Sequence, residues 1–138
     1  MTYDADNIFA RILRGEIPCH RVYEDADTLA FMDIMPQTEG HTLVVPKADA
    51  EDIFSAPPEA LAATMRTTQR IAAAVRKAFD APGVMIAQLN GPAAGQSVFH
   101  LHFHVIPRYA GKDFRMKSGP PADPAALAGH AARIRAAL

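Results

Sequence analysis

The sequence has no tryptophan and only one cysteine, Cys19, among its 138 residues. A single cysteine cannot form a disulfide within the chain, and paired-cysteine metal motifs are missing, which fits a reducing compartment. We expect Cys19 to be an unreactive thiol near the start of a strand. Residues 1–7 lack the basic and then apolar pattern of a secretory signal, and no apolar run approaches the ~20 residues of a membrane span. These absences predict a cytoplasmic protein with no membrane segment.

The chain also lacks an excess of either charge. Fourteen Lys and Arg face fifteen Asp and Glu, so the formal net charge is −1. Nucleic acids and anionic membranes attract strongly basic proteins, and neither is expected as a partner here. The length suits one hydrophobic core and is short for two. We therefore expect one domain over residues 1–138, whose specificity comes from a local site.

Apolar periodicity and turn residues predict the order helix, three strands, helix, two strands, helix. The expected ranges are 7–14, then 21–24, 28–33 and 42–45, then 58–79, then 84–89 and 98–106, and finally 125–138. Between the last strand and the last helix, residues 108–124 contain Gly, Pro and the basic residues Arg108, Lys112, Arg115 and Lys117, which indicates a loop. This order predicts an α+β fold with a mostly antiparallel sheet.

Three histidines alternate with apolar residues in His100-Leu-His-Phe-His104. On a strand, alternate side chains point to the same face, so the three imidazoles would lie on one face, toward a cleft or solvent. The intervening apolar side chains would pack on the core. Such a row of imidazoles is more typical of a functional site than of a structural one.

The row suits two kinds of chemistry. Neutral imidazoles bind zinc, copper or iron, and alternate strand positions can converge on one ion. Alternatively, one imidazole attacks phosphorus, because its ordinary pKa of about 6.5 leaves a nucleophilic nitrogen at physiological pH. The preceding loop, which contains Gly91, Gly95, Gln96 and Ser97, favours phosphorus, since backbone N–H groups and polar side chains there could bind an anion.

These residues resemble the histidine triad (HIT) superfamily, whose signature of three histidines alternating with apolar residues matches His100-Leu-His-Phe-His-Val-Ile106. The resemblance continues through residues 90–97, 31–37, 40–47 and 7–18, and is closest to the bacterial and Hint-like branch. It implies a HIT-like fold with a five-stranded antiparallel sheet, a long helix, short N- and C-terminal helices and an extension from about residue 108. It also implies a homodimer.

The resemblance further implies a two-step transfer in which His102 attacks the α-phosphorus of a nucleoside phosphoramidate, a dinucleoside polyphosphate or a related nucleotide. Water then releases the nucleoside monophosphate, AMP or GMP. His104, Ser97 and Gln96 would contact the phosphate, while His100 and His41 would orient the imidazoles. The implied nucleotide contacts are Asp33 at the ribose, Asn90 near the site, and Ile8, Phe9, Ile12, Ile34 and Leu43 around the base.

The chain departs from some bacterial relatives, which carry cysteines near the first helix that bind structural zinc. Here Ala10 follows Ile8-Phe9 and a second cysteine is missing, so we expect no zinc and no cofactor. The segment Pro107–Phe114 also differs from the ending of Hint proteins, so the resemblance to Hint does not determine which leaving group this protein prefers. His20 and His130 match no motif and are expected at the surface.

Three functions stay open at this stage. The first is a nucleotide hydrolase or nucleotidyl transferase that acts through a covalent nucleotidyl-histidine intermediate. The second is a nucleotide-binding adaptor or sensor whose hydrolysis is incidental, and the third is a metal-binding module. The resemblance favours the enzyme.

Overall fold

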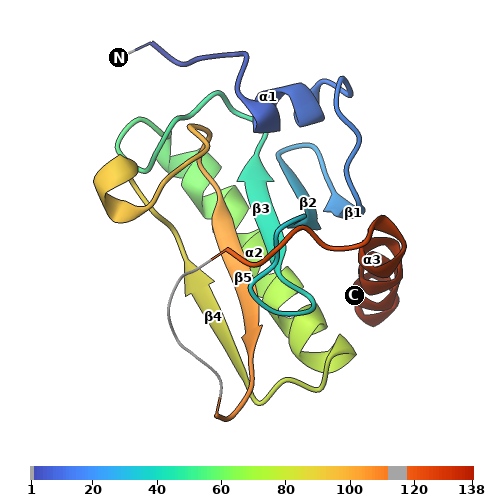
Figure 1. Ribbon diagram of the computed structural model, residues 1–138. Helices are drawn as coiled ribbons and strands as arrows, with labels where there is room; N and C mark the ends of the chain where they lie inside the picture. Colours follow the sequence, from blue (N-terminus) through green and yellow to red (C-terminus); the bar gives the residue numbers. More distant parts are fainter. Residues whose placement is uncertain (1, 112–117) are drawn as a thin grey trace.

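The protein, described by a computed structural model over residues 2–111 and 118–138, is built on a five-stranded antiparallel sheet. In chain order the elements are α1 (Ile8–Leu13), β1 (Arg21–Glu24), β2 (Thr28–Met32), β3 (Thr42–Pro46), α2 (Pro58–Ala78), β4 (Gly83–Ala87), the 3₁₀ turn η1 (Pro92–Ala94), β5 (Phe103–Arg108) and α3 (Pro124–Ala137) (Figure 1). The predicted α+β fold and the antiparallel sheet are confirmed. Within the described residues, the helices are too short or too polar to cross a membrane.

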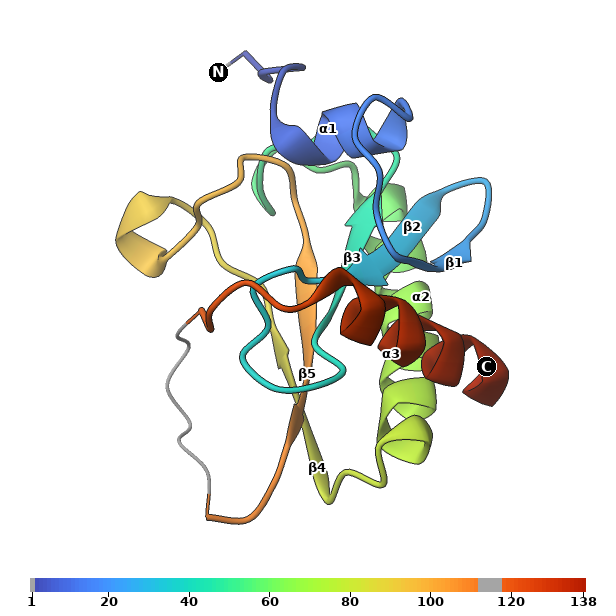
Figure 2. The ribbon, with the colours of Figure 1, turned by 45° about the vertical axis from the view of Figure 1, so that its right-hand side comes forward.

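The strands lie in the order β1-β2-β3-β5-β4. β1, β2 and β3 form an antiparallel meander, and the chain then runs through α2 to β4 at the far edge before β5 returns beside β3. In Figure 1, α2 passes behind the sheet, and Figure 2 shows α3 alongside α2. β5 is therefore a central strand, and His104 on it pairs with Leu43 on one side and Ala87 on the other.

The two faces of the sheet bury different clusters because side chains alternate along each strand. One face packs Ala30, Met32 and Val44 against α2 and α3. The opposite face packs Phe31 and Leu43 against Phe9 of α1. Phe103 and Val105 belong to the first cluster, so His104, which lies between them, faces the side of the sheet that α1 covers.

Helix α1 is short and depends on its cap. The Asn7 side chain accepts a hydrogen bond from the backbone N–H of Ala10 at 2.9 Å, and Gly15 follows the helix with a φ of +78°. Capping an otherwise unpaired N–H stabilises a helix by about 1 kcal/mol. The Asn7 cap and the turn at Gly15 fix where α1 begins and ends.

The strand that carries the histidines is shorter than predicted. It begins at Phe103, so His100 and His102 precede it. Before Phe103 the segment is bound to the chain that follows β3, because the Leu101 N–H donates to the Ala50 carbonyl at 2.8 Å. The prediction of a strand over 98–106 was therefore wrong at its start, and β4 likewise ends at Ala87. Alternation in the sequence cannot distinguish a paired strand from an extended segment.

The turn between β2 and β3 brings His41 to the start of β3. Gly40 in this turn has a φ of +95°, and a Cβ added to it would lie 2.8 Å from two ring carbons of Phe79, at the end of α2. Glycine is therefore required twice at this position, for its backbone conformation and for its lack of a side chain. The basic residues Lys112, Arg115 and Lys117 of the predicted loop lie outside the described residues.

Replacement of Gly40 by alanine tests this packing. We expect Gly40→Ala to lower the free energy of unfolding by about 2 to 4 kcal/mol, since backbone strain and overpacking add. Gly15→Ala is the matched control, because Gly15 also has a positive φ but no atom within 4 Å of the added Cβ. It should lose only about 1 to 2 kcal/mol. Urea denaturation measures both, and equal losses would contradict the contact with Phe79.

Candidate functional site

A cavity of about 360 Å³ lies between α1 and the sheet, next to the start of β5. Its lining is mainly apolar with a small polar group, which is typical of a site for a small organic ligand. The apolar part comprises Ile8, Phe9, Ile12, Ile17, Pro18, Cys19, Phe31, Met32, Ile34, Met35, Leu43, Leu89, Ala94 and Val98. The rest comprises Asp33, Gln37, Gly95, Ser97, His102, His104 and Ser118.

The structure places most of the predicted site residues on this cavity. Its walls include His102, His104, Ser97 and Asp33, together with all five residues predicted around the base, Ile8, Phe9, Ile12, Ile34 and Leu43. His41 does not line the cavity, but it contacts two residues that do, His104 and Asp33. Residues that the sequence analysis assigned to one site therefore meet in the structure, from α1, the end of β2, β3 and β5.

His102 is held by the backbone immediately before it. Its Nδ1 lies 2.7 Å from the carbonyl oxygen of His100, which can only accept, so Nδ1 carries the proton. In a neutral imidazole the other nitrogen, Nε2, is then unprotonated. The Phe9 ring meets the His102 ring edge-on, with centroids 4.9 Å apart. His102 therefore has the tautomer that a nucleophile needs, with an unshared electron pair on Nε2.

His104 has the opposite tautomer. The backbone N–H of Gln37 donates to Nδ1 of His41 at 3.0 Å, so the proton of the His41 ring must be on Nε2. That Nε2–H donates to Nδ1 of His104 at 2.9 Å. His104 consequently carries its own proton on Nε2, as a hydrogen-bond donor. The two cavity imidazoles therefore present one electron pair and one N–H, which is the combination needed to attack and to bind a phosphoryl group.

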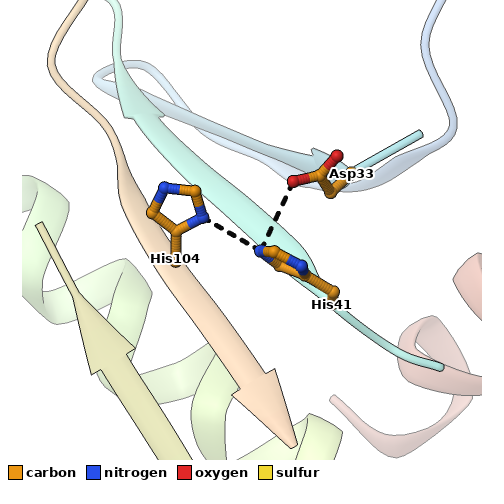
Figure 3. Close-up of side chains that lie close together, drawn as sticks. All are labelled: Asp33, His41 and His104. Carbon is orange, nitrogen blue, oxygen red and sulfur yellow. Dashed lines mark hydrogen bonds and ion pairs between the residues drawn. The ribbon is translucent and has the colours of Figure 1, made fainter. Parts of the chain in front are cut away.

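Asp33 completes this cluster from the end of β2. One of its carboxylate oxygens lies 3.4 Å from Nε2 of His41, and the other accepts from the backbone N–H of Met35 at 2.8 Å. Figure 3 shows Asp33, His41 and His104 converging from β2, β3 and β5. The carboxylate places a negative charge beside the imidazoles of the cluster.

Burial keeps these imidazoles neutral. Loss of hydration, together with smaller electrostatic effects of Arg108 and His102, lowers the pKa of His41 to about 4. Burial, with smaller effects of His102 and His41 and against the opposing effect of Asp33, lowers the pKa of His104 to about 4. The pKa of His102 is also lowered by burial, against the opposing effects of the His100 carbonyl and Asp33. At neutral pH the Nε2 electron pair of His102 is therefore available.

His100 lies apart from its two neighbours. Its side chain is completely buried, does not line the cavity, and donates from Nε2 to the carbonyl oxygen of Pro46 at 2.8 Å. The expectation that all three imidazoles face a cleft or solvent was therefore wrong for His100. It lies before β5, where the chain binds the segment after β3 and turns this ring inward.

Two predicted contacts, Gln96 and Asn90, are not on the cavity wall. The Gln96 amide is buried, accepts from the Gly91 N–H and donates to the carbonyls of Glu51 and Val98. The Asn90 amide accepts from the Ile53 N–H and is paired with the Gln88 side chain. Both amides thus hold the 88–98 loop to the segment after β3, and only Ser97 of that loop offers a side-chain hydroxyl to the cavity.

Sequence reasoning missed several cavity residues. Cys19 lines the cavity, and burial raises the pKa of its thiol. The thiol therefore stays protonated and forms part of the apolar wall. Gln37 and Ser118 also line it, from the turn before β3 and from the segment before α3. The apolar run Ile17-Pro-Cys19, shortly after α1, was the sequence signal from which this part of the wall could have been predicted. His20 and His130 were expected at the surface, but both are half-buried, and His130 packs edge-on against Phe79.

Asp33, His41 and His104 offer metal-ligand atoms within 4.8 Å of one another. To bind a cation, Nε2 of His41 would have to give up its proton. Moving that proton to Nδ1 would set it against the Gln37 N–H that now donates there. The donor pattern therefore favours a hydrogen-bonded chain over a cation site and supports the expectation of no metal, which stays a prediction.

Comparisons with known proteins agree with this geometry. The family model described as HIT domain matches residues 14–111. A crystal structure of a Hit-like protein from Bartonella henselae has a TM-score of 0.92 and 48% identity, covering 99% of this chain and 100% of that one. "Protein hit" of Bacillus subtilis is 44% identical over 106 residues, 77% of this chain and 73% of the relative. Adenylylsulfatase HINT3 of Arabidopsis thaliana is 38% identical over 107 residues, 78% of this chain and 54% of the relative.

The neutral imidazoles predict a pH dependence of stability. Their folded pKa values lie below the ordinary 6.5, so the stability they contribute is complete above pH 6.5 and is lost as the pH falls toward 4. We expect the loss in unfolding free energy between pH 7.5 and 4.5 to be about 1 to 3 kcal/mol smaller in His104→Asn than in the parent protein. Urea denaturation across this range measures it. A parental slope in His104→Asn would contradict the neutral pair.

Proposed function

The chain belongs to the HIT domain family, and on that premise we propose that it is a nucleotide-binding hydrolase or nucleotidyl transferase. It acts on the α-phosphorus of nucleoside phosphoramidates or related nucleotides, with His102 as the nucleophile. The observation that carries this proposal is the hydrogen bond from His102 Nδ1 to the His100 carbonyl, because it leaves the Nε2 electron pair on a neutral ring at the cavity.

In the first step, Nε2 of His102 forms a bond to phosphorus while the bond from phosphorus to the leaving group breaks, and the leaving group keeps the electron pair and takes up a proton from solvent. The imidazole becomes positively charged as it is nucleotidylated. The His100 carbonyl and the Asp33 carboxylate both favour the charged ring, so they stabilise the state that the reaction creates. The Nε2–H of His104 and the Ser97 hydroxyl donate to the phosphoryl oxygens.

In the second step, water attacks the nucleotidyl-histidine. The water oxygen binds phosphorus, the P–N bond breaks, and its electron pair returns to Nε2 of His102. The proton from water goes to solvent, and the nucleoside monophosphate leaves. This step regenerates the neutral nucleophile, which the low pKa of His102 favours at physiological pH.

The remainder of the cavity suits a nucleoside. Its apolar walls, from α1, the Ile17–Cys19 run and Leu43, offer a slot for a flat purine base. Asp33, which lines the same cavity, accepts hydrogen bonds from the ribose hydroxyls, and AMP or GMP is the expected product. We also propose that the protein acts as a homodimer in the cytoplasm, as the family resemblance implies, without nucleic acid, membrane or cofactor.

The leaving group is best determined by comparing substrates. The relative named adenylylsulfatase acts on an adenylyl sulfate, so the panel includes that compound beside adenosine and guanosine phosphoramidates and a diadenosine polyphosphate. We expect kcat/KM to be highest for a phosphoramidate, with adenosine and guanosine within about tenfold of each other, because the base slot is apolar. A preference for the polyphosphate above tenfold would contradict the proposed leaving group.

Replacement of the nucleophile tests the reaction itself. His102→Asn should lower kcat at least about 10³-fold, since His104, the other imidazole among the described cavity residues, has its unprotonated nitrogen bound to the Nε2–H of His41. AMP binding, measured by calorimetry, should survive within about tenfold. His20→Asn is the control for loss of an imidazole outside the cavity and should keep parental turnover. Near-parental turnover of His102→Asn would refute the assignment.

A further inference from the structure

The hydroxyl of Tyr3 contacts His100 from outside the cavity. Its oxygen lies 2.5 Å from Nδ1 of His100, and the two rings meet edge-on with centroids 5.7 Å apart. Tyr3 does not line the cavity. This contact connects the segment before α1 to the first histidine of the row, 97 positions along the chain.

The direction of each hydrogen bond follows from its partners. His100 Nε2 donates to the Pro46 carbonyl, so Nδ1 is the acceptor and the Tyr3 hydroxyl is the donor. The Tyr3 oxygen accepts in turn from the side-chain amide of Asn7 at 2.8 Å. Burial raises the pKa of Tyr3 and lowers the pKa of His100, so the hydroxyl keeps its proton and the ring stays neutral.

This chain of contacts ends at His102. The His100 ring is held at both nitrogens, and the carbonyl of the same residue accepts the Nδ1–H of His102 at 2.7 Å. Asn7 at the other end also caps α1, whose Phe9 meets the His102 ring edge-on. Tyr3 is thus linked by contacts to both groups that orient His102, the His100 carbonyl and the Phe9 ring.

We propose that Tyr3 is a positioning residue for His102, acting through His100 and α1 without touching the substrate. This inference rests on the proposed role of His102 as nucleophile. The Pro46 carbonyl fixes the His100 tautomer, and the Tyr3 hydroxyl holds the other nitrogen of the same ring, so both contacts together fix the peptide whose carbonyl directs the His102 ring. Without the hydroxyl, the His100 ring is held at one nitrogen only, its peptide can shift, and the His102 ring can rotate away from the cavity.

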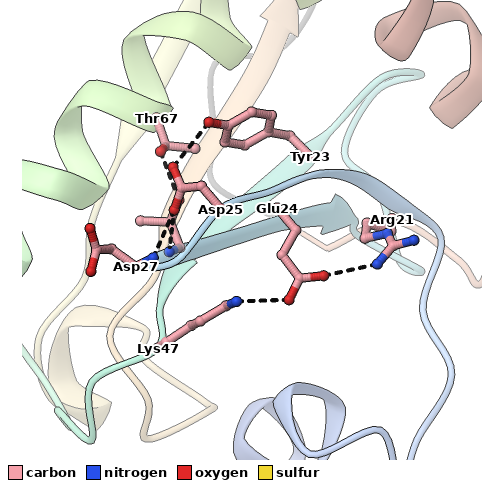
Figure 4. Close-up of polar contacts among 8 residues, drawn as sticks. Arg21, Tyr23, Glu24, Asp25, Asp27, Lys47 and Thr67 are labelled. Atoms are coloured by element: carbon pink, nitrogen blue, oxygen red, sulfur yellow. Dashed lines mark hydrogen bonds and ion pairs between the residues drawn. The ribbon is translucent and has the colours of Figure 1, made fainter.

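Tyr3→Phe removes only the hydroxyl. We expect kcat for an adenosine phosphoramidate to fall about 3- to 10-fold, the effect of one buried hydrogen bond. KM should stay within about twofold, because Tyr3 contributes nothing to the cavity wall. Tyr23→Phe is the matched control: Tyr23 is also half-buried, and its hydroxyl donates to Asp25 at 3.0 Å, in a polar cluster at the β1–β2 turn (Figure 4). It should keep the parental kcat.

The second readout needs no turnover. In ¹⁵N NMR of the free protein, we expect His100 protonated on Nε2 and His102 on Nδ1 in the parent and in Tyr23→Phe. In Tyr3→Phe, His102 should show a mixture of both tautomers. A parental kcat together with parental tautomers in Tyr3→Phe would overturn the inference.

The two proposals can fail separately. If the parent protein does not turn over the phosphoramidate although its tautomers are as described, the proposed function fails. The NMR comparison of Tyr3→Phe with Tyr23→Phe then still decides the role of Tyr3. If the parent protein is active and only the Tyr3→Phe comparison shows no change, the function stands and the positioning role is refuted.

Discussion

The site depends on one constraint, which is that backbone groups fix the proton positions of its imidazoles. The Pro46 carbonyl binds the Nε2–H of His100, the His100 carbonyl binds the Nδ1–H of His102, and the Gln37 N–H binds Nδ1 of His41. Backbone groups cannot change from donor to acceptor, so each ring has one available tautomer. His102 then presents an electron pair to the cavity, and His104 presents an N–H. Histidines that are identical as residue types therefore have distinct roles in the site.

The fold supplies this constraint where strands begin and end. Asp33 follows β2, His41 precedes β3, and His100 and His102 precede β5. In these positions backbone groups are free to bind side chains, whereas inside the sheet they would bind the neighbouring strand. Burial under α1 and beside the sheet then keeps the rings neutral. Position and desolvation together account for the reactivity proposed for His102.

Much of this arrangement could be predicted from the sequence. The order of elements and the antiparallel sheet follow from periodicity and turn residues, and the match around His100–Ile106 correctly indicated the family. Other features depend on backbone geometry that no side-chain pattern encodes. The Gln37 N–H reaches His41 only because of the turn conformation, and the Gln96 amide binds backbone carbonyls although its residue type suits phosphate equally well. The burial of His100 and the late start of β5 have the same origin.

The central claim is that the reacting phosphorus atom becomes covalently bonded to His102 before water attacks it. Each in-line displacement at phosphorus inverts its configuration, so two successive displacements restore it. The most direct test is hydrolysis of a nucleoside phosphoramidate made chiral at phosphorus with sulfur, in ¹⁸O-labelled water, followed by ³¹P NMR of the product. The account predicts overall retention of configuration. Overall inversion would mean that water attacks directly, and would contradict a nucleotidyl-histidine intermediate.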